Sequence, residues 1–190
     1  MHLSLNEDQV QILDFLDSLA KPYAAVPLHD TAFALHSDAL DAELAEGGFL
    51  DVMAMSELGP VTAALVVEKL ARLPVAVECG ASALVRPLLD PALPRPLCLV
   101  MEGQLRKPVR FLRPGATVVV VGESGVSSFT ASADHVRDAG EEVLYAYPMA
   151  YLTSVRAEVQ QHAFSPAEVM RAWRVGLAAE AAGLLAAALQ

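Results

Sequence analysis

The chain has 190 residues, 54% of them hydrophobic, and a formal net charge of −10 at pH 7. This length predicts one or two small domains with a substantial core, and the high apolar content excludes a disordered chain. The negative charge argues against nucleic acid or an anionic membrane surface as the main partner.

Residues 1–90 are expected to form a helical domain. Near its start, Asn6 and Gln9 have the spacing of a capping box, and apolar side chains then recur at helical intervals until Pro22. Asp38 is expected to cap the next helix, which ends at a pair of glycines. Further helices are expected over residues 49–58, 60–73 and 75–85.

Residues 91–160 are expected to form a small β-domain. Three prolines within residues 91–96 mark its boundary with the helical domain. Short strand-like runs joined by glycine-rich turns then predict a small antiparallel sheet or a partial barrel. The expected strands cover residues 97–101, 109–112, 117–121, 126–130, 143–147 and 151–155.

Residues 161–190 are expected to form one long helix. Ser165 is suited to the N-cap, Pro166 to the first helical position, and Glu168 to the closing position of a capping box. Alanine and leucine dominate the rest, and no proline interrupts it. The predicted fold class is therefore α+β, with an N-terminal helical domain, a small antiparallel β-domain and a long C-terminal helix.

The second half of this last helix is apolar on every side, with Glu180 as its only charge after Arg174. Such a helix needs cover on all its faces. The length of the run, its alanine content and Glu180 argue against a membrane span. Two interpretations remain: packing on the chain's own domains, or a bundle completed by other chains. In the bundle, Gly176, Ala179 and Gly183 would form the face of close approach.

Most short motifs give little support to a site. The segment 121–126, VGESGV, resembles a nucleophile elbow, but its second glycine, Gly125, comes one residue early, which favours a hairpin turn. The five histidines lack ligand spacing, so no metal site is predicted, and no glycine-rich phosphate loop is present.

A cluster of basic residues stands out in this acidic chain. It is either a solvated face of the β-domain or a site for a phosphate-bearing ligand or an acidic partner surface. The cluster consists of Arg95, Arg106, Lys107, Arg110 and Arg113.

The compartment is predicted to be the cytoplasm. The first residues, MHLSLNEDQ, lack the basic start and the apolar run of a signal peptide. The two cysteines, Cys79 and Cys98, lack metal-type or paired spacing, and buried free thiols are expected.

Three stretches, taken in this order, resemble the acyl-CoA dehydrogenase family. Residues 5–19 resemble the opening helix of the family, residues 44–77 its glycine-rich turn and following helix, and residues 174–189 the first helix of its C-terminal bundle. The resemblance implies an N-terminal helical domain, a shortened middle β-domain and only the first helix of a four-helix bundle that tetramerises in the family.

The resemblance also implies a cofactor site. In the family, the first middle-domain strand ends in a Thr-Glu-Pro loop, followed by Gly-Ser-Asp, that contacts flavin and the acyl thioester. Met101, Glu102 and Gly103 occupy this position here, which implies FAD binding by these residues. Only the glutamate matches, and no Gly-Ser-Asp follows. The glutamate base of the family and its arginine segment for the FAD pyrophosphate have no counterpart, so no catalytic residue is assigned.

The expected function follows from the resemblance. It is a subunit of a flavin-dependent oxidoreductase that acts on the CH–CH bond of an acyl-CoA thioester. A homo- or hetero-oligomer through the C-terminal helix is expected, with a full-length acyl-CoA dehydrogenase subunit as one candidate partner that supplies the base. Two alternatives are a non-catalytic structural or regulatory protein without flavin, and a stand-alone acyl-CoA-binding module.

Overall fold

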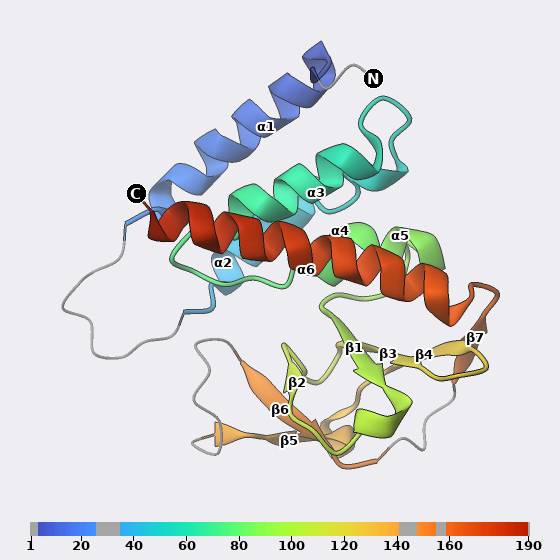
Figure 1. Ribbon diagram of the computed structural model, residues 1–190. Helices are drawn as coiled ribbons and strands as arrows, with labels where there is room; N and C mark the ends of the chain where they lie inside the picture. Colours follow the sequence, from blue (N-terminus) through green and yellow to red (C-terminus); the bar gives the residue numbers. More distant parts are fainter. Residues whose placement is uncertain (1–3, 26–34, 141–147, 155–158, 190) are drawn as a thin grey trace.

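The computed structural model describes residues 4–25, 35–140, 148–154 and 159–189, and it places a layer of helices above a β-region (Figure 1). The longer helices are α1 (Glu7–Ala20), α2 (Asp38–Glu46), α3 (Gly59–Leu70), α4 (Gly80–Leu84), α5 (Arg86–Leu89) and α6 (Pro166–Ala188). Short 3₁₀ helices are η1 (Lys21–Tyr23), η2 (Val52–Ala54), η3 (Glu102–Gln104) and η4 (Ala133–His135). This arrangement confirms the α+β class.

The first helix begins as the sequence predicts. The Asn6 side chain accepts a hydrogen bond from the Gln9 backbone N–H at 2.7 Å, and the Gln9 side chain accepts one from the Asn6 N–H at 3.0 Å. Helix α2 starts at Asp38, but its cap is Ser37, whose hydroxyl accepts from the Leu40 N–H. The predicted Asp38 cap is therefore wrong by one residue.

The helix predicted over residues 49–58 is wrong. Gly48 and Gly59 both have positive φ, 67° and 68°, which breaks the helical path on either side. Between them the chain turns through η2, and Phe49, Leu50 and Val52 enter the core. The burial of these three side chains in the core favours the turn over the predicted helix.

The helix predicted over residues 75–85 is only partly present. Its first residues are not helical, and Ala76 forms a parallel bridge with His36. Helix α4 begins at Gly80, where the carboxylate of buried Glu78 accepts from the Ala81 and Ser82 N–H groups. A buried acidic side chain thus caps this helix.

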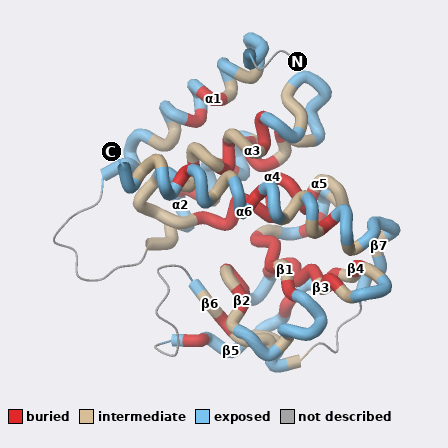
Figure 2. Tube along the Cα trace, viewed as in Figure 1, coloured by how far each residue is buried: buried red, intermediate tan, exposed pale blue. Residues whose placement is uncertain are grey.

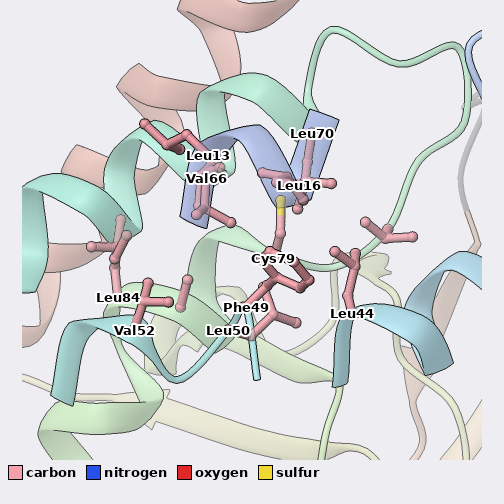
Figure 3. Close-up of a cluster of buried hydrophobic side chains, with 14 of the residues drawn as sticks. Leu13, Leu16, Leu44, Phe49, Leu50, Val52, Val66, Leu70, Cys79 and Leu84 are labelled. Carbon is pink, nitrogen blue, oxygen red and sulfur yellow. The ribbon is translucent and has the colours of Figure 1, made fainter. Parts of the chain in front are cut away.

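The helical region has one continuous hydrophobic core. Figure 3 shows side chains from α1, α2, α3, α4 and the turn around η2 meeting in this cluster. Leu16, Leu44, Val52 and Val66 have no measurable exposure, which is the packing expected of a stable core. The labelled members are Leu13, Leu16, Leu44, Phe49, Leu50, Val52, Val66, Leu70, Cys79 and Leu84.

The β-region contains two sheets. The strands are β1 (Leu97–Met101), β2 (Val109–Arg110), β3 (Thr117–Val121), β4 (Val126–Thr130), β5 (Val136–Asp138), β6 (Met149–Leu152) and β7 (Gln160–His162). One sheet has the order β1-β3-β4-β7 and the other β2-β6-β5.

The prediction of a small antiparallel sheet or a partial barrel is wrong for one pair of strands, because β1 pairs with β3 in parallel. The chain between them passes through η3 and β2, which belongs to the other sheet, so it returns in the same direction. The predicted strand 109–112 shrinks to two residues because Phe111 has a φ of 56°. Of the strand predicted over residues 151–155, only the first two residues are in a strand, at the end of β6, and Thr153 and Ser154 are not. Strands β5 and β7 were not predicted, and the expected strand 143–147 lies outside the described residues.

Helix α6 begins with the predicted capping box, in which Ser165 accepts from the Glu168 N–H. It lies along the helical layer and contacts α3 and α4 (Figure 1). Its small residues face the chain's own helices: a Cβ at Gly176 would lie 3.2 Å from the Gly80 carbonyl oxygen, and one at Gly183 would overlap that of Glu68. The bundle interpretation assigned this face of α6 to contacts with other chains, but in the structure it packs against helices of the same chain.

Part of the surface of α6 is exposed among the described residues. Leu184 and Leu185 are 60% and 65% exposed, and Figure 2 shows exposed positions along the outer side of the helix. The described residues therefore do not cover this helix on every side. In the parts of the chain that the structure describes, no helix is both long enough and apolar enough to cross a bilayer.

Candidate functional site

An open cleft of about 1040 Å³ lies where the end of β1, η3 and the β3–β4 turn meet the first half of α6. Met101, Glu102 and Gly103, the three residues assigned to a cofactor loop, all line this cleft. Arg171 and Arg174 of α6 line it too. The structure therefore brings the predicted loop together with two arginines from a segment nearly seventy positions later in the sequence.

The β3–β4 turn forms one wall of the cleft and confirms the predicted hairpin. Val121 and Val126 are paired antiparallel, and the Gly122 N–H donates to the Gly125 carbonyl at 3.0 Å. A Cβ at Gly122 would lie 2.6 Å from Oε2 of Glu102, so a glycine here lets this carboxylate approach the turn. At Gly103, by contrast, a Cβ would meet nothing within 4 Å.

The cleft combines an apolar surface with charges of both signs. Met101, Val121 and Met170 supply the apolar part, and methionine adapts its shape to planar or irregular ligands. Arg171 and Arg174 are three residues apart on α6, so their side chains project from neighbouring positions on one helix face. Guanidinium groups in this arrangement suit phosphate or carboxylate groups.

A smaller inner cavity of about 230 Å³ lies between β1, β2 and α6. It shares Met101, Gln104 and Met170 with the cleft, so the two are adjacent. Its walls are largely apolar and include Trp173, the only tryptophan of the chain. The buried wall residues are Leu97, Cys98, Val100, Val109 and Phe111.

An ion pair between Arg110 and Glu180 borders the inner cavity. Nη1 and Nη2 of Arg110 each donate to Oε2 of Glu180 at 3.1 Å. The other oxygen of Glu180 lies beside Gly80, where a Cβ would be only 2.8 Å away. A third cavity, of about 200 Å³, has the same pair and Phe111 in its lining, together with Leu73, Leu184 and other apolar residues.

Buried Glu78 also borders the inner cavity, but its hydrogen bonds identify it as a structural group. Its carboxylate accepts from the Ala81, Ser82 and Leu97 N–H groups and from the Ser82 hydroxyl. Burial raises the pKa of Glu78, and the nearby guanidinium of Arg95 opposes this shift. With its lone pairs occupied, this carboxylate organises the start of α4 and of β1.

Neither cysteine is suited to nucleophilic chemistry. Cys79 and Cys98 are both free and buried, as the sequence predicts. Burial raises the pKa of each thiol, and Glu78 adds to the increase at both. Both thiols stay protonated at neutral pH and act as packing groups.

Three members of the basic cluster join the β-region to the helical region. Arg95 pairs with Asp41 at 2.7 Å, and Arg113 pairs with Asp38 at 2.8 Å. Together with Arg110–Glu180, these pairs use acidic groups of the same chain. Arg113 is also exposed, as a solvated face of the β-region requires, and a phosphate-bearing ligand or an acidic partner remains a prediction. Arg106 and Lys107 remain exposed, and Lys107 lines the inner cavity.

Sequence patterns did not reveal Arg171, Arg174 or Trp173 as site residues. The sequence did contain a pattern that could have indicated the two arginines: they lie three positions apart, shortly after a helix cap, on a helix that is mostly apolar. Only the fold shows that this helix face meets the end of β1. Within the described ranges, no group of three or more His, Cys, Asp or Glu residues could hold a metal ion.

The chain was compared with protein-family models, with curated proteins and with solved structures. None of the three comparisons finds a match. A function is therefore inferred from the geometry of the cleft and its inner cavity.

Proposed function

We propose that the chain is an acyl-CoA dehydrogenase-like subunit of a flavin-dependent oxidoreductase, and that its cleft binds FAD and the thioester end of an acyl-CoA. One observation carries this proposal. Met101, Glu102 and Gly103, which match the family's flavin loop in position, line a large cleft together with two arginines of α6. Its volume of about 1040 Å³ is slightly above the ~300–1,000 Å³ typical of ligand sites.

The residues of the cleft fit such a cofactor. Met101, Val121 and Met170 give the apolar contact that an isoalloxazine ring needs, and the space around Gly103 allows close backbone approach. Arg171 and Arg174 would hold the phosphates or balance negative charge on a reduced flavin. When bound, the flavin supplies the hydride acceptor.

The chain's own residues would bind and orient rather than abstract a proton. Removal of the α-proton of an acyl-CoA requires a positioned base. Glu102 packs against Gly122, and Glu78 is fully hydrogen-bonded. Glu123 lines the cleft from the exposed β3–β4 turn, where solvent surrounds it, so none of the three is assigned this role. We assign the base to a partner chain, and the exposed Leu184 and Leu185 on α6 are a surface on which such a chain could pack.

Flavin binding tests the proposal. The purified protein is expected to bind added FAD, seen as a change in the visible flavin spectrum and as quenching of Trp173 fluorescence. Arg174→Ala is expected to weaken FAD binding by about tenfold or more, because a charge-assisted hydrogen bond contributes roughly 1.5–3 kcal/mol. Arg72→Ala is the matched control, since Arg72 lies just beyond the end of α3, pairs with Glu68 of that helix and does not line the cleft.

Two results would contradict the proposal: no FAD binding by the wild type, or equal affinity of the wild type and Arg174→Ala. The exposed leucines of α6 also support a second function, a non-catalytic interaction protein. An oligomer that binds neither FAD nor acyl-CoA would favour that function.

A further inference from the structure

The cleft, the inner cavity and the third cavity are arranged in series. The cleft and the inner cavity share Met101, Gln104 and Met170. The inner cavity and the third cavity share Arg110, Phe111 and Glu180. The Arg110–Glu180 pair and the Phe111 ring therefore separate two cavities that would otherwise form one longer tunnel leading inward from the cleft.

The apolar part of the inner cavity's wall suits a hydrocarbon chain, and its polar part consists of Glu78, Gln104, Lys107, Arg110 and Glu180. Leu97, Val100 and Val109 are at least 95% buried, and Trp173 and Met170 of α6 line the cavity with them. At roughly 30 Å³ for each water-sized group, its 230 Å³ holds about eight non-hydrogen atoms. This is room for a short acyl group but not for a long one.

The ion pair makes the inner end of this cavity unfavourable for a methyl terminus. The side chains of Arg110 and Glu180 are 31% and 14% exposed, so water still reaches both groups. An acyl chain long enough to touch them would displace that water and leave charged groups against hydrocarbon. Oε1 of Glu180 lies 2.8 Å from the place that a Cβ on Gly80 would take, so the glycine leaves room for this carboxylate at the inner end of the cavity.

The geometry points to a chain-length limit: we propose that the inner cavity is the acyl-binding site and that the Arg110–Glu180 pair restricts it to short acyl groups. This inference rests on the proposed function, and it deepens that function by naming the substrate class and the two residues that determine it. The third cavity behind the pair is the space that a longer chain would occupy if the pair were apolar.

The test compares butanoyl-CoA, dodecanoyl-CoA and free CoA as probes, with binding followed by calorimetry and by the fluorescence of Trp173. Wild-type protein is expected to bind butanoyl-CoA at least tenfold more tightly than dodecanoyl-CoA, since one misfitting methylene already changes discrimination by about 10-fold or more. The double variant Arg110→Met/Glu180→Leu is expected to reverse this order. Replacing both charges together with apolar groups of similar size is often neutral for stability.

A second variant tests the entrance without disturbing the core. Gln104 is exposed and lines both the cleft and the inner cavity, so Gln104→Phe is expected to weaken butanoyl-CoA binding by about tenfold. Gln11→Phe is the matched control, because Gln11 is exposed on α1 and does not line the cavity.

The outcomes separate this inference from the proposed function. FAD and thioester binding with the same chain-length order in the wild type and the double variant would overturn the inference alone. An unchanged butanoyl-CoA affinity in Gln104→Phe would do the same. Thioester binding with the expected order but without FAD would support the inference and contradict the flavin function. Binding of neither FAD nor any thioester would reject both.

Discussion

Replacement of Gly183 by alanine is expected to lower the free energy of unfolding by about 3 kcal/mol, and replacement by leucine by more. In an exposed helix interior the same change to alanine would stabilise by up to ~1 kcal/mol. The sign reverses here because a Cβ at this position would overlap the Glu68 carbonyl oxygen and lie 2.8 Å from the Ala71 Cβ. Urea denaturation, followed by circular dichroism, measures the change.

The matched comparison is Gly176→Ala in the same helix. A Cβ there would lie 3.2–3.4 Å from the backbone of Gly80, a contact that a small shift relieves, so a smaller loss is expected. Leu185→Ala, at a position 65% exposed, should change stability by less than about 0.5 kcal/mol in an isolated chain. A Gly183→Ala protein as stable as the wild type would show that α6 does not pack closely on α3.

Replacement of Glu78 by alanine is expected to cost about 3–5 kcal/mol, the typical effect of removing one member of a buried charged network. The change leaves the N–H groups of Ala81 and Leu97 without their acceptor, and it removes the carboxylate beside Arg95. Chemical denaturation measures this loss. Glu46→Ala, at an exposed position of α2, is the control and should have little effect. A loss at Glu78 no larger than at Glu46 would contradict the structural role.

Glu78 also gives stability a pH dependence of defined sign. Burial raises its pKa above the ordinary value of 4.5, although Arg95 opposes the shift. The folded state therefore keeps this proton to a higher pH than the unfolded state does. Its contribution to stability falls as pH rises from about 4.5 towards the folded pKa.

Denaturation curves at a series of pH values check this sign. Between pH 4.5 and the folded pKa, the wild type is expected to lose stability relative to Glu78→Gln, whereas the difference should be constant at lower pH. A difference that grows in favour of the wild type as pH rises would mean that the pKa is lowered rather than raised.

Local signals in the sequence predicted local structure well. The capping boxes at Asn6 and Ser165 are found as expected, because each depends on residues within three positions of the cap. The helix predicted over residues 49–58 is absent because two positive-φ glycines and the burial of Phe49 outweigh local propensity. The prediction of a hairpin at Gly122 is also confirmed, because a hairpin turn, like a helix cap, depends on residues close together in the sequence.

Non-local pairing limited the prediction of the sheet and of the site. The parallel pairing of β1 with β3 depends on where the intervening chain travels, which no run of side chains encodes. The resemblance predicted that Met101–Gly103 form a cofactor loop; the structure shows that these residues line a cleft and that Arg171 and Arg174 line the same cleft. The partners of Arg95, Arg110 and Arg113 likewise lie 54 to 75 positions away in the sequence.

The packing of α6 on α3 has a consequence for the order of folding. The two helices are separated in the chain by the whole β-region, yet Gly183 meets Glu68 directly. Bringing α3 and α6 together closes a long loop of chain, which is slow because its entropy cost must be met before the stabilising contacts form. During synthesis the helical layer therefore emerges first but stays without its last helix until the β-region has followed. We expect this layer to be less stable until α6 has packed on α3 and α4.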